Sequence, residues 1–272
     1  MITLEQLQAG IVLPIDKPRQ WTSFQAVNKV KAVVRNTYGL KKFKIGHAGT
    51  LDPLATGLLL VCIGKATKTI PQLQDSDKVY TGTFVFGATT PCFDLERPID
   101  NYYPYEHITP TLIKQTLPQF TGTVMQVPPM FSAVKIAGQR AYEYARLDDP
   151  TVTIQSKPVN IYSFEITAFR EGERSKVKGE RYVDANITSH LSPLTSHLYQ
   201  NPLGEVPAHL PQADFRIHCG KGTYIRSIAR DLGLVLGSGA FLSALRREQT
   251  GEYSIANALQ LDQVEGYLCS RI

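Results

Sequence analysis

Residues 46–57, with the sequence GHAGTLDPLATG, constrain the fold more than any other stretch of the chain. Three glycines and one proline in this short segment exclude a regular helix or strand there. The apolar run 58–63 follows directly and predicts a buried strand. A structured loop that ends at a buried strand can hold its one carboxylate, Asp52, in a fixed position. That carboxylate is either a catalytic group or a structural one that bonds the amides of its own turn.

Length and composition indicate a globular protein. The chain has 272 residues, of which 43% are hydrophobic, enough for one large domain or two small ones with a substantial core. No apolar run is long enough to span a bilayer, and residues 1–9 carry no basic cluster of the kind that opens a signal peptide. The four cysteines are far apart and form no CxxC pair, which favours neither a zinc site nor a disulfide framework. We therefore expect a reduced, cytoplasmic protein without a metal.

The distribution of charge is more informative than the formal net charge of +5. The first fifty residues contain eight lysines and arginines but only two acidic residues. A basic segment beside the Asp52 loop is typical of a surface that binds a polyanion. The alternative is that these side chains form an ordinary solvated helix face.

Hydrophobic periodicity predicts alternating strands and helices. Thr22 or Ser23 can cap a helix with Phe24, Val27, Val30 and Val33 on one face. Further helices are predicted over 67–73, 109–119, 224–236 and 256–268, and strands over 11–15, 58–63, 78–86, 120–127, 152–169 and 213–218. Residues 241–246 and 251–253 are expected to close the sheet. Because no strict βαβ order appears, the pattern favours an α+β fold with a mixed, mostly antiparallel central sheet flanked by helices and loops.

Several segments in order resemble one enzyme family. Residues 46–57 closely resemble the catalytic motif of the TruB family of tRNA pseudouridine synthases. The resemblance extends to LPIDKP at 13–18, GKATK at 64–68, DKVY at 77–80, PPMFSAVK at 128–135 and CGKGTYIRS at 219–227. Order and spacing agree over residues 10–250, so the resemblance is specific.

The resemblance implies a pseudouridine synthase fold and a single catalytic domain over residues 1–272. It implies an RNA-gripping insertion near 126–150, which should form a hairpin-like turn followed by a helix. Residues 170–212 have no clear period and are expected to be an irregular insertion, either a local β excursion or a mobile loop. Members of the family commonly carry a C-terminal PUA-type RNA-binding domain, and we expect none here, because the chain ends soon after Tyr253.

By the same resemblance, the chain is an isomerase that converts uridine 55 in the T-loop of tRNA to pseudouridine, without a cofactor. Its partner is tRNA through the T-arm, with no obligate protein partner, and we expect a monomer. Asp52 would be the covalent catalyst, attacking the base or assisting loss of the ribose C1′ bond. Arg226 would hold Asp52 ionised and oriented. Tyr80 would stack on the extruded base and help to move a proton.

The resemblance also implies contacts with the substrate. His47 would occupy the space that the extruded base leaves, Asp94 would hydrogen-bond the base or RNA, and Leu245 would line the uracil pocket. Lys17, Lys68 and Tyr224 would contact RNA. Residue type alone also allows an ordinary structural role for each of three residues. Tyr80 could be a core tyrosine, His47 a capping or surface histidine and Arg226 a helix-surface arginine.

Two other classes of protein are alternatives to this enzyme. A non-catalytic RNA-binding or RNA-folding protein could share the scaffold, but it would not need Asp52, Tyr80 and Arg226 together. A nucleotide enzyme with a phosphate-binding loop is excluded, since the sequence has neither GxxxxGK[ST] nor a strand-flanked GxGxxG.

Overall fold

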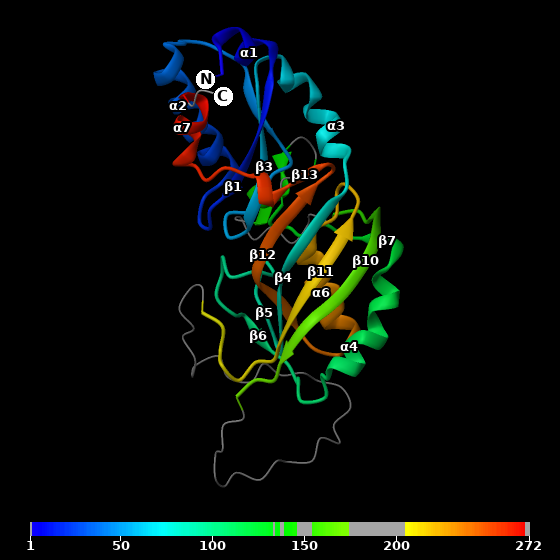
Figure 1. Ribbon diagram of the computed structural model, residues 1–272. Helices are drawn as coiled ribbons and strands as arrows, with labels where there is room; N and C mark the ends of the chain where they lie inside the picture. The colour runs from blue at the N-terminus through cyan, green and yellow to red at the C-terminus, as the bar shows by residue number, and fades with distance from the viewer. Residues whose placement is uncertain (1, 133, 137–138, 146–153, 174–204, 270–272) are drawn as a thin grey trace.

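A nine-stranded sheet forms the centre of the computed structural model, which describes residues 2–132, 134–136, 139–145, 154–173 and 205–269 (Figure 1). The strand order is β1-β3-β12-β4-β11-β10-β7, with β2 added beside β3 and β13 beside β12. The strands are β1 (Ile11–Lys17), β2 (Ile45–Ala48), β3 (Thr56–Ile63), β4 (Lys78–Phe86), β7 (Gly122–Gln126), β10 (Lys157–Arg170), β11 (Gln212–Cys219), β12 (Ala240–Thr250) and β13 (Tyr253–Ser254).

Most neighbouring strands run antiparallel. Within the described part of this sheet, the single parallel pair joins β12 to β3, where Arg246 lies opposite Thr56. The expected mixed, mostly antiparallel sheet is therefore confirmed. Strand β12 lies between β3 and β4 rather than at an edge, so it joins the N-terminal half of the sheet to the rest.

Helices cover the two halves of the sheet separately (Figure 1). The helices are α1 (Leu4–Ala9), α2 (Ser23–Tyr38), α3 (Ile70–Asp75), α4 (Pro110–Thr116), α5 (Ala141–Ala145), α6 (Ile225–Val235) and α7 (Gln263–Cys269), with 3-10 turns over Gly64–Thr69, Leu117–Phe120 and Ile255–Asn257. Helices α2 and α7 pack together at the N-terminal end, and α6 packs on β12. Two short hairpins pair β5 (Ala88–Thr89) with β6 (Asn101–Tyr102) and β8 (Lys135–Ile136) with β9 (Gln139–Arg140).

Helix α2 begins at a capping box. The Thr22 hydroxyl accepts the backbone N–H of Gln25, and the Gln25 side chain accepts the backbone N–H of Thr22, which satisfies two free donors of the first turn. Gly39 ends the helix in the left-handed conformation. The buried face runs through Ala26, Val27, Val30 and Val34. The expectation for Phe24 is wrong, because its position in the first turn points outward and leaves 69% of the side chain exposed.

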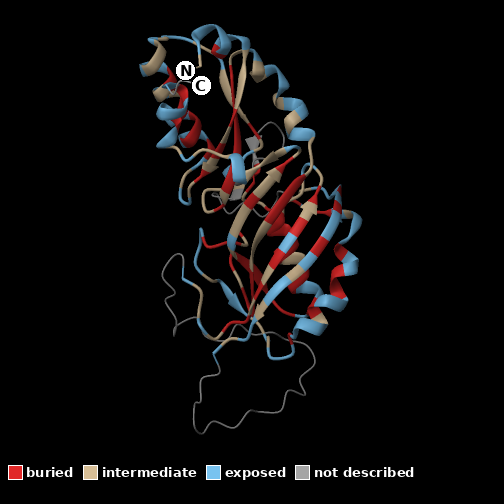
Figure 2. Ribbon diagram, in the orientation of Figure 1, coloured by how far each residue is buried: buried red, intermediate tan, exposed pale blue. Residues whose placement is uncertain are grey.

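The core follows the middle strands of the sheet (Figure 2). Strand β3 is buried from Gly57 to Ile63, because both of its faces are covered. On the other half, Phe84 of β4 stacks on Phe215 of β11 with ring centroids 4.1 Å apart. The Asp52 segment thus connects two strands, β2 and β3, that are anchored in the packed core.

Two expectations about local structure need correction. Residues 46–48 belong to β2, although glycine there argued against a strand, because pairing with β3 supplies the hydrogen bonds. The predicted terminal helix over 256–268 is divided into a 3-10 turn at Ile255–Asn257 and the shorter α7. Most of the insertion predicted at 170–212, and part of the one near 126–150, lie outside the described residues. No helix of the described chain is long and apolar enough to cross a membrane.

Candidate active site

The loop that carries Asp52 is held by hydrogen bonds from Ser23 of α2 and from Gln20, which lies between β1 and α2. The Ser23 hydroxyl, 2% exposed, accepts the Leu51 backbone N–H at 2.9 Å and donates to the Leu51 carbonyl at 3.1 Å. The backbone N–H of Gln20 donates to the Pro53 carbonyl at 2.9 Å. Both residues that flank Asp52 are therefore fixed, so the carboxylate has little freedom to move with its loop.

Lys17, the last residue of β1, also hydrogen-bonds the Asp52 loop. Its ammonium group donates to the carbonyls of Trp21 at 2.5 Å, Pro18 at 3.0 Å and Pro53 at 3.3 Å. The side chain is 0% exposed, and burial lowers its pKa to about 8. An ammonium group has three protons, and these three carbonyls can accept all of them. The contact predicted between Lys17 and RNA stays a prediction.

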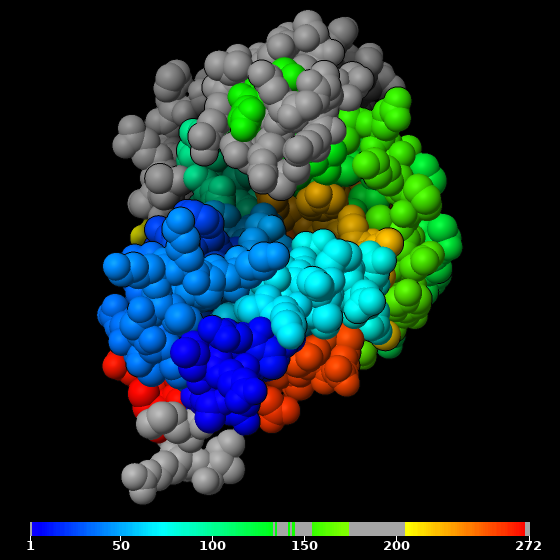
Figure 3. Space-filling view, turned by 90° about the horizontal axis from the view of Figure 1, so that it is seen from above, coloured from blue at the N-terminus to red at the C-terminus, as the bar shows by residue number. Residues whose placement is uncertain are grey.

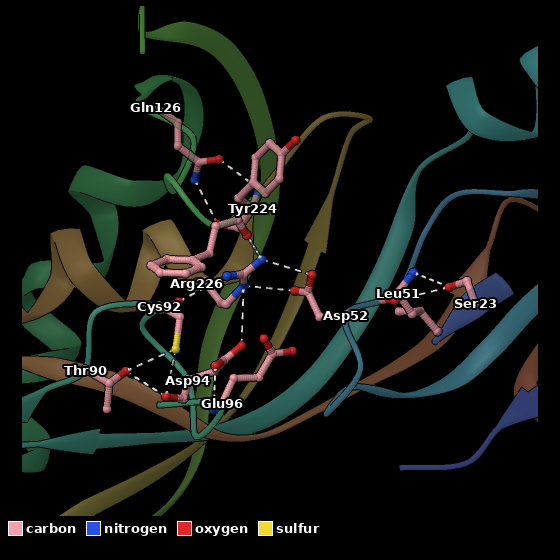
Figure 4. A network of polar contacts seen from close by, with 11 residues as sticks. Ser23, Leu51, Asp52, Thr90, Cys92, Asp94, Glu96, Gln126, Tyr224 and Arg226 are labelled. Carbon is pink, nitrogen blue, oxygen red and sulfur yellow. Dashed lines mark hydrogen bonds and ion pairs between the residues drawn. The ribbon is translucent and has the colours of Figure 1, made fainter. Parts of the chain in front are cut away.

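Arg226, in the first turn of α6, grips Asp52 with two parallel hydrogen bonds (Figure 4). Its Nε donates to Oδ2 and its Nη2 to Oδ1, each at 2.9 Å. The arginine side chain is 5% exposed, whereas that of Asp52 is 35% exposed. Burial opposes the charge of Arg226, but the neighbouring carboxylates outweigh it, so the pKa of the guanidinium is raised. Asp52 is thus bound on one side by a buried cation and open to solvent on the other.

Arg226 also donates hydrogen bonds to two backbone carbonyls. Nη1 donates to the Cys92 carbonyl at 3.1 Å, and Nη2 also donates to the Phe131 carbonyl at 2.8 Å. Asp94 lies 3.6 Å from Nε, and its side chain is 7% exposed. Burial raises the pKa of Asp94, against the opposing charge of Arg226. Arg226 is therefore fixed from several directions, and the contact predicted between Asp94 and the base or RNA stays a prediction.

Asp52, Asp94 and Arg226 line one small pocket together with Leu245. Its other walls are Leu54, Ala55 and Leu242–Ala244. The pocket holds about 10 Å³ of free space, which is room for roughly one water molecule. A flat pyrimidine base is larger than this enclosed space, but the Asp52 side chain at its edge is 35% exposed, so the pocket is open to solvent there. In Figure 3, α6 is visible at the bottom of a hollow bordered by N-terminal segments.

Tyr80 and His47 lie near the Asp52 loop and are both influenced by the charge of Arg247. Tyr80 of β4 is 9% exposed and pairs in register with Arg247 of β12. Burial raises the pKa of Tyr80, the charge of Arg247 opposes this, and the Asp52 carboxylate is close enough to raise it further. His47 of β2 is half-buried, with Nε2 3.3 Å from the Thr50 hydroxyl, and burial followed by the Arg247 charge lowers its pKa.

Arg247 is the residue of this region that the sequence interpretation missed. It is 1% exposed, lies opposite Tyr80 in the sheet and donates a hydrogen bond to the Gly49 carbonyl at the start of the Asp52 loop. The available signal was its place in β12, two residues after Leu245. In a strand, residues two apart share a face, so Arg247 was positioned to point inward with Leu245.

Two residues that were predicted to contact RNA lie in different places. Tyr224 is near Asp52, and Lys68 lies at a separate pocket. The backbone N–H of Tyr224 donates to the Gln126 side chain at 2.8 Å, and burial raises the pKa of its hydroxyl, with Asp52 adding to the effect. Lys68 is exposed on the rim of a separate pocket of about 370 Å³. This basic pocket has apolar walls of Leu7, Leu40, Phe43 and Ile63 and a rim of Lys42, Lys44, Lys65 and Lys68.

No cluster of His, Cys, Asp or Glu side chains suited to a metal ion occurs among the described residues.

Comparison with known proteins identifies the family. The model for the N-terminal domain of TruB family pseudouridylate synthases matches residues 35–181, more than half of the chain. A tRNA pseudouridine synthase B of Flavobacterium johnsoniae is 46% identical over 97% of this chain and 98% of its own. The chain belongs to the TruB family of pseudouridine synthases. It is therefore an isomerase, as the resemblance implied.

Two further TruB-family matches agree with this assignment. The model for the C-terminal domain of tRNA pseudouridylate synthase B matches residues 226–271, which include α6 and β12. A tRNA pseudouridine synthase B of Thermobifida fusca is 38% identical over 94% of this chain and 74% of its own.

Solved structures support the pseudouridine synthase fold. The structure of a Cbf5-Nop10-Gar1 complex matches with a TM-score of 0.59 and 25% identity over 96% of this chain. This TruB-family chain spans 55% of the length of that matched chain. The structure of an H/ACA RNP bound to a substrate RNA containing 2′-deoxyuridine matches with a TM-score of 0.56 at 22% identity.

Proposed function

We propose that this TruB-family enzyme converts uridine 55 in the T-loop of tRNA to pseudouridine, with Asp52 as the covalent catalyst. The observation that carries the proposal is a carboxylate bound by buried Arg226 on one side and 35% exposed on the other. The relatives named tRNA pseudouridine synthase B support tRNA as the substrate. A cytoplasmic location and a monomeric state belong to the same proposal.

The reaction breaks the bond between N1 of uracil and C1′ of ribose and forms a bond from C5 to C1′. C5 loses a proton and N1 gains one, so the atoms balance without a cofactor. A carboxylate can attack and later leave, either at the base or at C1′. Arg226 contributes by keeping Asp52 ionised and by fixing both of its oxygens, which sets the direction of the exposed lone pairs.

The target base must first leave its stack, because its reacting atoms are otherwise inaccessible. In our proposal, His47 occupies the vacated space while the base moves between Tyr80 and Leu245. The 35% exposed side of the Asp52 carboxylate is the side from which the base would approach. Tyr224 and Asp94 would contact the RNA near the extruded nucleotide. Sequence-specific enzymes of this kind act on loops, since loop bases can be turned outward.

Chemical mapping of the product tests the proposal. Unmodified tRNA transcript is incubated with the enzyme, and pseudouridine is located at single-nucleotide resolution. We expect modification at position 55 and none in a transcript with cytidine there. Binding without any product would instead support the non-catalytic RNA-binding protein, and product at another uridine would overturn the assignment of the site.

The basic pocket is expected to strengthen RNA binding without affecting chemistry. Lys65→Ala and Lys68→Ala should each reduce the slope of log affinity against log salt concentration by about 0.7 to 1, because each removed phosphate contact releases one fewer counterion. The maximal rate should stay unchanged. Titration of tRNA at several salt concentrations measures the slope. Lys114→Ala, on exposed α4 at the other end of the sheet, is the matched control. Unchanged slopes in both pocket variants would remove this pocket from the interface.

A further inference from the structure

Arg247 is a buried cation at the junction of three strands. It lies on β12 opposite Tyr80 of β4 on one side and opposite Gly57 of β3 on the other. Its Nε donates to the Leu58 carbonyl at 2.7 Å, and its Nη2 donates to the Gly49 carbonyl at 3.0 Å. Because directly opposite residues of an antiparallel pair lie on the same face of the sheet, the Arg247 side chain lies beside that of Tyr80. Burial raises the pKa of Tyr80, and the charge of Arg247 opposes this. One side chain therefore connects the start of the Asp52 loop, the strand after it and Tyr80.

This arginine has no carboxylate partner in the part of the chain that the structure describes. Its neighbour Arg246 behaves differently and forms a two-bonded ion pair with Asp16 at 3.1 and 2.8 Å. Removing a cation from water without a counterion is costly, and the cost is offset only partly by hydrogen bonds to neutral groups. Such a residue is a poor choice for stability alone.

The glycines of the Asp52 segment make room for this arginine. A Cβ at Gly49 would lie 3.3 Å from Arg247 Nη1, and a Cβ at Gly57 would lie 2.4 Å from the Arg247 carbonyl oxygen. Both glycines also have positive φ angles, of +83° and +101°. Two of the three glycines in residues 46–57 thus serve the contact with β12, which explains the close fit between this loop and Arg247.

A polar contact between the neighbouring side chains of Arg247 and Tyr80 has one possible direction. A guanidinium has donors only, so in such a contact the tyrosine oxygen accepts and the hydroxyl proton points away from Arg247. Since Asp52 is close enough to influence Tyr80 electrostatically, this orientation matters on the side of the substrate.

We propose that Arg247 is a positioning residue of the reaction, which fixes the Tyr80 hydroxyl and the Gly49 carbonyl in one arrangement around Asp52. The inference rests on the proposed function of Asp52 and Tyr80. Arg247 does not touch the substrate. It acts through Tyr80, and misplacement of such a group by about 1 Å can lower a rate 100-fold.

The test is a double-mutant cycle on the rate of pseudouridine formation. Arg247→Met, Tyr80→Phe and the double variant are compared with the unchanged enzyme at saturating tRNA. Arg247→Met should lower kcat by about 10- to 100-fold with KM changed less than about 3-fold. In the Tyr80→Phe background, where no hydroxyl remains to be oriented, the same substitution should lower kcat by a clearly smaller factor.

Two further variants separate positioning from stability. Arg246→Met removes the Asp16 ion pair from the same strand and should lower the melting temperature without changing kcat. Arg247→Lys keeps a buried cation and serves if the methionine variant does not stay folded. It should still lower kcat, because one ammonium cannot span Leu58, Gly49 and Tyr80.

Unchanged kcat in a folded Arg247 variant, or an equal loss with and without the Tyr80 hydroxyl, would overturn the inference. Either result would leave the proposed function intact, since the unchanged enzyme would still form pseudouridine. Absence of product from the unchanged enzyme would instead contradict the proposed function itself.

Discussion

An Asp52→Asn variant is expected to bind tRNA normally and to form pseudouridine at least about 10⁴-fold more slowly, because removal of a covalent catalyst costs more than removal of any supporting group. The substitution preserves shape but not chemistry. An amide oxygen is a poor nucleophile, and the amide NH₂ would face the Arg226 fork, which needs two acceptors. The fold should remain intact, because Arg226 keeps the Asp94 carboxylate at 3.6 Å and its hydrogen bonds to the carbonyls of Cys92 and Phe131.

Single-turnover assays with tRNA tritiated at C5 of uridine measure this rate, since C5 loses its hydrogen as pseudouridine forms. Binding is measured separately by titration of the same tRNA. Asp214→Asn is the matched control, because Asp214 also accepts two hydrogen bonds from one arginine, Arg170, at 2.5 and 2.7 Å on a partly exposed face of the sheet. The control should retain full activity. Near-normal turnover in Asp52→Asn would rule out covalent catalysis by this residue.

The elements that depend on local signals were predictable from the sequence. The cap at Thr22, the strand over Lys78–Phe86 and the buried run of β3 each reflect interactions within a few residues. The central position of β12 was not predictable, because it depends on pairing with strands more than 150 residues earlier. Phe24 shows the limit of periodicity, since an apolar residue at helical spacing can still face solvent.

The candidate site also contains some residues whose positions were predicted and others whose positions were not. The pairing of Asp52 with Arg226 was expected from the family resemblance, and the structure brings these residues together across 174 positions. The burial of Lys17 and Arg247 was not predicted from the sequence, because long basic side chains are usually exposed. Both are buried here by backbone carbonyls of the Asp52 loop or its flanking strand, which only the folded chain brings near them.

Arg226→Lys is expected to lower the rate of pseudouridine formation by at least about 100-fold while changing tRNA affinity little. Lysine keeps the charge but loses the planar fork. One ammonium cannot donate to both Asp52 oxygens and also to the carbonyls of Cys92 and Phe131. Asp52 would then rotate away from its productive direction, and two buried carbonyls would lose their partners, which also predicts a lower melting temperature.

The same single-turnover assay measures this loss, and Arg170→Lys is its matched control on the Asp214 pair. Because charge is conserved in both variants, a selective loss at Arg226 would isolate geometry as the cause. If Arg226→Lys turned over at the normal rate, charge alone would suffice to hold Asp52 ready, and the two-bonded geometry would have no part in catalysis. If it lost activity only by unfolding, the rate at temperatures well below its melting point would equal that of the unchanged enzyme. A loss of rate that persists there, with tRNA affinity intact, is the result that an oriented carboxylate requires.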